Sequence, residues 1–187
     1  EMGIIYAFNK DGFEHDYAKA LECFREAITK GSKQNNHYYL GLMYYRGLGV
    51  SKDTSEGIRL WQEGTERGES MSQCALGEIY HYKSEPRDYA KAKELYEKAI
   101  HNGLSFAYSY LGILYEQGLG VDSDIKKASE FYEKSKCGRG YYQLGILVEK
   151  YKGGIVLSRY NVSTCYRKSA ELNYAKGQAA YGRKQLQ

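Results

Sequence analysis

The feature that most constrains this sequence of 187 residues is a glycine that returns at an almost constant interval. In five of its six copies the glycine follows Leu or Met, and in the last it follows Tyr. The intervals are 38, 36, 35, 33 and 37 residues between Gly3, Gly41, Gly77, Gly112, Gly145 and Gly182. A unit of this length cannot bury a hydrophobic face alone, whereas stacked copies can. The spacing therefore predicts a repeat protein with five complete units and the start of a sixth.

A second pattern follows each of these glycines at a nearly constant offset. It is clearest at Asp88, where Ala92, Tyr96, Ala99 and Gly103 follow at steps of four, four, three and four residues. Such steps place side chains on one face of a helix, with Asp as its N-cap and Gly as its left-handed C-terminal residue. Each unit is therefore predicted to be a helix pair. The other copies begin at Asp16, Asp53 and Asp124, where the fourth ends at Gly138, and at Ser158 in a degenerate fifth copy that ends at Asn173.

The repeated glycines lie inside the first predicted helix of each pair, where Gly costs about 1 kcal/mol relative to Ala. A cost that recurs in register implies a compensating gain. We expect that gain to be close approach of the second helix, which carries Trp61, Tyr96 or Tyr132. A ligand site on the exposed backbone is the less favoured interpretation.

Two segments resemble a known family: LGLMYYRGLGVSKDTSEGIRLW and LGILYEQGLGVDSDIKKASEFY are similar to Sel-one-like repeats, a branch of the tetratricopeptide superfamily. The resemblance implies an all-α fold, a right-handed α-solenoid of about five stacked antiparallel helix pairs. Residues 1–187 would form a single domain with repeats at 1–34, 35–70, 71–105, 106–138 and 139–175 and a terminal helix at 176–187. Repeats one, three and five carry NKDGF, KSEPRD and YKGGI in place of the Gly-x-Gly-Val turn, so their turns are expected to differ.

The sequence gives no indication of a cofactor or metal. The two Gly-x-Gly stretches lack the continuation of a phosphate-binding loop, and the four cysteines form no Cys-x-x-Cys pair. Cys23 and Cys165 share a position in repeats one and five, too far apart along a solenoid to bond. Reduced cysteines favour a cytoplasmic location. A secreted or periplasmic location stays open if a signal peptide preceded the sequence.

Catalysis, nucleic-acid binding and membrane insertion are not expected. The four histidines are scattered, and Glu78 with His81 is more typical of a solvated helix face than of a catalytic dyad. A net charge of +4 is too small to indicate a nucleic-acid-binding surface. No stretch approaches the roughly 18 apolar residues of a membrane span.

The resemblance also implies that the first helices line a concave surface. Tyr side chains on it are good anchors, and Glu side chains suit the Lys or Arg of an extended or helical peptide. We expect these positions not to be needed for the core. The predicted partner-binding residues are Tyr38, Leu42, Tyr45, Arg46, Glu78, His81, Tyr82, Glu116, Gln117, Tyr142, Glu149 and Lys150, with Cys74, Ser109, Ile113 and Ile146 at the same positions.

These observations predict a non-enzymatic module that binds another protein or peptide. The resemblance places such modules among adaptors in bacterial signalling and host interaction and in eukaryotic membrane-associated degradation complexes. Two alternatives stay open: binding or hydrolysis of a cell-wall or carbohydrate ligand by a secreted bacterial repeat protein, and the scaffold part of a longer enzyme. The identity of the partner and the oligomeric state are not encoded in these patterns.

Overall fold

The computed structural model of the protein describes residues 3–4, 7, 16–32, 34–151 and 160–186. Within these ranges the fold is all-α, and helices that follow one another in the chain pack in pairs. This confirms the predicted α-solenoid fold class. The chain divides into two compact units, Glu1–Ser84 and Glu85–Gln187, each described by itself below.

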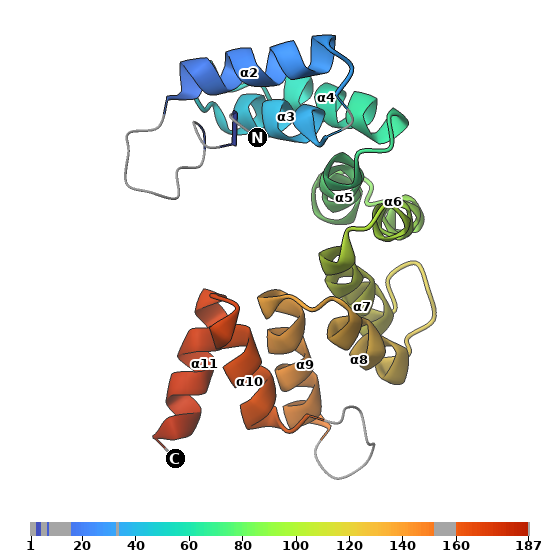
Figure 1. Cartoon of the computed structure of the whole chain (residues 1–187). Helices are drawn as coiled ribbons and strands as arrows, with labels where there is room; N and C mark the ends of the chain where they lie inside the picture. The colour runs from blue at the N-terminus through green and yellow to red at the C-terminus, as the bar shows by residue number, and fades with distance from the viewer. Residues whose placement is uncertain (1–2, 5–6, 8–15, 33, 152–159, 187) are drawn as a thin grey trace. The chain divides into compact units, whose positions relative to one another are not determined.

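In the first unit each helix packs on the next along the chain, so that α3 contacts α2, α4 and α5 (Figure 1). A short π-helical turn, Ile79–Lys83, continues α5. The helices are α2 (Tyr17–Thr29), α3 (Asn36–Arg46), α4 (Thr54–Glu66) and α5 (Ser70–Glu78).

In the second unit, too, each helix packs on the next along the chain. There α9 packs on α10, and α11 contacts both. A 3₁₀ turn, Ser105–Ala107, precedes α7. The helices are α6 (Tyr89–His101), α7 (Tyr108–Gln117), α8 (Ile125–Lys134), α9 (Gly138–Lys150), α10 (Val162–Glu171) and α11 (Ala175–Gln185).

The second helix of a repeat begins at an Asp N-cap, as predicted. Oδ1 of Asp53 accepts a hydrogen bond from the backbone N–H of Glu56 at 2.9 Å, which satisfies a donor that the helix leaves unpaired. The fifth copy differs, because Asn161 caps α10 through the N–H of Thr164 at 2.8 Å and Ser158 lies outside the described residues. The same Asp cap is found at Asp16, Asp88 and Asp124.

The left-handed residue after this helix is also found where it was predicted in four copies. Gly31, Gly68, Gly103 and Asn173 have φ values of 70°, 80°, 89° and 56°. The prediction is wrong for the fourth copy, where Lys136 has φ 48° and Gly138 is instead the first residue of α9.

In repeats two and four the turns between paired helices follow the motif, while residues 9–13 of repeat one and 152–155 of repeat five lie outside the described residues. In both Gly-x-Gly-Val turns the N–H of the capping Asp donates to the first helix at 2.9 Å, from Asp53 to Tyr44 O and from Asp124 to Tyr115 O. Repeat three lacks this motif and has another geometry, as expected. There the N–H of Ser84 donates to the carbonyl five residues earlier, which widens the last turn of the helix.

Glycine inside the first helix allows the second helix to approach closely. A Cβ on Gly41 would lie 2.6 Å from Nε1 of Trp61, and one on Gly145 would lie 2.5 Å from a ring carbon of Tyr166. Both distances are far below van der Waals contact. The packing role predicted for these glycines is confirmed, and Gly112 shows it again against the ring of Tyr132.

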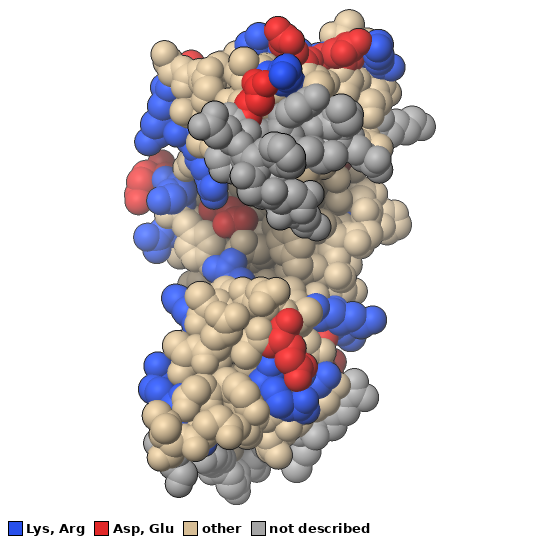
Figure 2. All heavy atoms as spheres, turned by 60° about the vertical axis from the view of Figure 1, so that its left-hand side comes forward, with Lys and Arg blue, Asp and Glu red and all other residues tan. Residues whose placement is uncertain are grey.

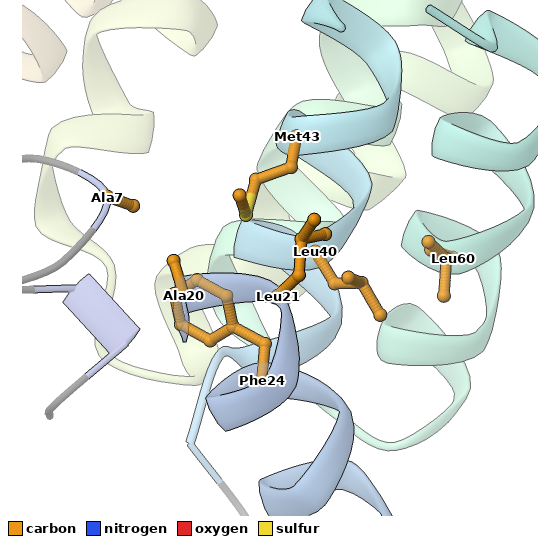
Figure 3. Close-up of a cluster of buried hydrophobic side chains, with 7 residues drawn as sticks. All are labelled: Ala7, Ala20, Leu21, Phe24, Leu40, Met43 and Leu60. Atoms are coloured by element: carbon orange, nitrogen blue, oxygen red, sulfur yellow. The ribbon is translucent and has the colours of Figure 1, made fainter. Parts of the chain in front are cut away.

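The core of each unit lies along the seam between neighbouring helices. In the first unit the cluster in Figure 3 joins side chains of α2, α3 and α4 with Ala7. Its members are Ala7, Ala20, Leu21, Phe24, Leu40, Met43 and Leu60. In the second unit the core cluster comprises Ile113, Ala128, Tyr132, Leu144, Leu147 and Cys165.

Candidate partner-binding surface

Six of the predicted partner-binding residues line one cavity in the first unit. The cavity has a volume of about 220 Å³ and lies between α3, α4, α5 and the π-helical turn. Aromatic and aliphatic side chains form most of its wall, and three charged side chains reach it. We call it the Trp61 pocket; its lining residues are Tyr38, Leu42, Tyr45, Arg46, Trp61, Ala75, Glu78, Ile79, Tyr82 and Lys83.

The floor of the Trp61 pocket is set by the close contact of α3 and α4. Because Gly41 has no side chain, the indole of Trp61 lies against the backbone of α3 and donates a hydrogen bond from Nε1 to Tyr38 O at 3.1 Å. The rings of Tyr45 and Trp61 then meet with centroids 5.0 Å apart, and Tyr38 stacks on Trp61 at 6.4 Å. The aromatic wall is therefore held by core packing.

The open side of the pocket carries the exposed ring of Tyr82. Tyr82 is 40% exposed, which is unusual among the large hydrophobic residues that the structure describes, and its ring stacks on His81 with centroids 3.8 Å apart. Tyr82 and Lys83 both come from the π-helical turn, whose extra residue per turn shifts them relative to a regular helix.

Charge at the pocket comes from Glu78, which is half-buried, and from Arg46 and Lys83, which are exposed. Within the described residues no ion pair includes any of these three side chains. Burial, reinforced by the nearby Glu78 carboxylate, raises the pKa of the Tyr38 phenol above its ordinary value near 10. Tyr38 is therefore a neutral hydroxyl at physiological pH.

The two other predicted Glu side chains have structural roles, and the expectation that the core does not need them is wrong. Glu116 accepts a hydrogen bond from the buried Tyr132 hydroxyl at 2.6 Å. Glu149 accepts one from Tyr166 at 2.9 Å and pairs with Lys184 at 2.7 Å. Each of these carboxylates satisfies the hydroxyl of the large aromatic residue on the second helix.

Several other predicted surface positions are buried. His81 is only 2% exposed, so it lies beneath Tyr82 and does not face a partner. Cys74, Ser109 and Ile113 are also buried. The prediction placed these residues on the surface, whereas neighbouring helices cover the first helices on more than one face.

Within the described part of the chain, none of the remaining predicted residues of the second unit lines the hollow found there. Gln117 and Lys150 are exposed, while the half-buried Tyr142 packs between the rings of Tyr166 and Tyr174 at 5.9 and 5.6 Å. That shallow hollow involves the turn residues 121–126 and Tyr115 instead. The predicted surface is thus brought together in the first unit.

The sequence-based prediction missed four residues of the Trp61 pocket. Trp61 was assigned to the packing of the second helix, which it also serves, and Ala75, Ile79 and Lys83 fall on positions that were not considered. One signal was available in the sequence. Trp61 is the single tryptophan and occupies a slot that is otherwise Phe or Tyr.

The described residues contain no group of three or more His, Cys, Asp or Glu side chains that could hold a metal ion. All four cysteines are free thiols, with Cys74 and Cys165 buried. Burial raises the pKa of the Cys165 thiol to about 12.

On the face drawn in Figure 2, basic and acidic side chains lie beside one another in small groups, and uncharged areas separate these groups. Among the helices of the described ranges, none is long and apolar enough to cross a membrane.

Comparison with known proteins decides the family. The Sel1 repeat model matches four consecutive segments, residues 1–32, 37–69, 70–104 and 105–137. This chain belongs to the Sel1 repeat family. Repeat five, predicted at 139–175, lies beyond the matched segments, although α9 and α10 form a helix pair there.

The chain is similar to proteins with quite different names. ERAD-associated E3 ubiquitin-protein ligase component HRD3B of Arabidopsis thaliana is 29% identical over 69% of this chain and 14% of its own length. Beta-lactamase HcpA of Helicobacter pylori is 33% identical over 49% of the chain and 29% of its own. The crystal structure of c5321, a protective antigen of uropathogenic Escherichia coli with an SLR fold, aligns with TM-score 0.73 and 31% identity.

That alignment covers 99% of this chain and 40% of c5321. The chain therefore corresponds to less than half the length of each of these relatives.

Proposed function

We propose that this Sel1 repeat chain is a non-enzymatic protein-binding module and that its Trp61 pocket receives a side chain of a protein or peptide partner. The observation that carries this is the convergence of Tyr38, Leu42, Tyr45, Arg46, Glu78 and Tyr82 on one cavity. Rigid aromatic rings with an apolar body and a polar tip are a common means of binding protein surfaces.

The size of the pocket supports a single side chain as its occupant. Pockets for cofactors and drug-sized ligands usually have volumes of roughly 300–1,000 Å³. The Trp61 pocket, at about 220 Å³, is smaller. A partner would insert one residue there and lie with the rest of its length on the surrounding helices.

A relative adds support for an adaptor role. HRD3B is, by its name, a component of a ubiquitin-protein ligase and thus one part of a larger assembly. An adaptor role in this chain would need a binding surface and no assembled active site.

An enzymatic role is the alternative that HcpA raises, because that protein is called a beta-lactamase. The pocket argues against such chemistry here. Its carboxylate, Glu78, has a buried His81 one turn away whose ring is stacked under Tyr82, so the imidazole is covered on that side. Incubation of the chain with a chromogenic cephalosporin tests this directly, and turnover above a heat-denatured control would contradict the non-enzymatic proposal.

The binding proposal is tested with peptides selected from a random library displayed on phage. Selected peptides are titrated against the wild-type chain, a Tyr82→Ala variant and a control variant, Arg67→Ala, whose residue is exposed and outside the pocket. We expect Tyr82→Ala to weaken binding at least about tenfold, as truncation of an anchor does, and Arg67→Ala to leave it unchanged. Selected peptides that bind both variants like wild type would contradict the proposal.

A further inference from the structure

The Trp61 pocket differs from the matching places in repeats four and five in one respect. In repeats four and five the large aromatic residue of the second helix is a Tyr whose hydroxyl is bonded to Glu116 or Glu149. Repeat two has Trp61 there, and Tyr45 in place of the Glu. In repeat two, a hydrogen bond between a tyrosine hydroxyl and a glutamate carboxylate therefore cannot form at this position, and the cavity lies there.

The carboxylate of the pocket has no ion-pair partner among the described residues. Glu78 is half-buried, lines the cavity together with Tyr38 and Tyr82, and takes part in no ion pair or hydrogen bond found within the described residues. A carboxylate that is partly removed from water is stabilised by a cation at short range. Arg46 and Lys83 do not meet this need, because they are exposed and make no ion pair with it.

The wall of the pocket suits a flat cation better than a compact one. The rings of Tyr38, Tyr45, Trp61 and Tyr82 all line it. A guanidinium stacks on aromatic faces and forms two parallel hydrogen bonds with a carboxylate, whereas an ammonium is a more strongly hydrated point charge.

We propose that the Trp61 pocket takes an arginine side chain of a protein partner as its anchor, with Glu78 as the counter-ion. This rests on the proposed protein-binding function and specifies its chemistry. The guanidinium lies against the tyrosine rings and pairs with the Glu78 carboxylate. Acidic residues beside that arginine in the partner pair with Arg46 and Lys83 at the exposed edge.

The test uses peptides selected on the intact chain from the phage library, with their affinities measured by calorimetry. The basic residue of each peptide is replaced by citrulline, which keeps the shape of arginine and removes its charge. On the protein, Glu78→Gln removes the counter-ion with little change of shape. The control is Glu66→Gln, because Glu66 is an exposed carboxylate in the same unit and outside the pocket.

We expect selected peptides to share an arginine, and citrulline or Glu78→Gln each to weaken binding at least about tenfold. The two changes together should cost little more than either alone, because they remove the same interaction. Glu66→Gln should leave the affinity unchanged. Replacement of the arginine by lysine should weaken binding by a smaller factor.

Two results separate this inference from the proposed function. Peptides that need Tyr82 but lack arginine, or whose binding Glu78→Gln leaves unchanged, would overturn the arginine anchor and leave the binding function standing. Peptides whose binding ignores Tyr82 and Glu78 alike would overturn both.

Discussion

The side chains of Asn35 and Glu69 cap each other's helices in neighbouring repeats. Asn35 precedes α3, and its Oδ1 accepts a hydrogen bond from the backbone N–H of Met71 in α5 at 3.0 Å. Glu69 precedes α5, and its carboxylate accepts from the backbone N–H groups of His37 and Tyr38 in α3 at 3.3 and 3.2 Å. The first helices on either side of the Trp61 pocket are thereby joined at their N-termini.

Replacement of Glu69 is expected to destabilise the fold. The carboxylate is buried and also accepts from Ser72 at 2.9 Å, with Nδ1 of His37 2.7 Å away. Glu69→Ala would leave several buried donors unpaired, each of which costs about 1–3 kcal/mol. We expect a loss of at least about 2 kcal/mol in the free energy of unfolding, measured by urea denaturation. Glu66→Ala is the control.

Glu66 is exposed on α4, and surface changes of this kind usually stay within about 0.5 kcal/mol. If Glu69→Ala were no more destabilising than Glu66→Ala, the reciprocal caps would not contribute to stability. Glu69→Gln should cause an intermediate loss in the free energy of unfolding. The amide keeps one acceptor oxygen, but its NH2 group is a donor that faces other donors.

Two glycines within helices should respond in opposite ways to alanine. Gly145→Ala places a Cβ 2.5 Å from the ring of the buried Tyr166 and should cost about 1–3 kcal/mol through overpacking. Gly182→Ala in α11 meets nothing within 4 Å and should stabilise by about 0.5–1 kcal/mol through helix propensity. Thermal unfolding of both variants checks this, and a stabilising Gly145→Ala would refute the close-approach explanation.

The buried thiol of Cys165 predicts a loss of stability at alkaline pH. Its pKa is raised to about 12 by burial, from an ordinary value near 9. Between these values the unfolded chain releases the proton and the folded chain keeps it, so the unfolded state is favoured as pH rises. The urea midpoint should therefore fall above pH 9, and Cys165→Ala should fall less steeply over the same range. Parallel curves for the two proteins would contradict this.

Much of the fold was predictable because its determinants are local. Asp53, Asp88 and Asp124 cap helices through donors three residues away, and Gly41 packs on the aromatic residue of its own repeat. The reciprocal caps of Asn35 and Glu69 were not predicted. They join residues 31 to 36 positions apart in the sequence and occur where the repeat pattern has no fixed residue type.

The candidate site was predicted less completely. The repeat register correctly predicted that Tyr38, Tyr45 and Tyr82 lie together. It could not show that Glu116 and Glu149 accept hydrogen bonds from buried tyrosine hydroxyls. Nor could it show the burial of His81, because the π-helical turn after α5 has no equivalent in the repeat pattern. Positions that depend on contacts between helices need the structure.

The resonance of the Trp61 indole N–H is the most direct test of the arginine pocket. It is the only indole of the chain and lies in the pocket wall. Addition of a selected arginine peptide to the ¹⁵N-labelled protein should shift this resonance, and the citrulline peptide at equal concentration should shift it much less. A peptide that binds the protein and leaves the Trp61 resonance unmoved would contradict the account.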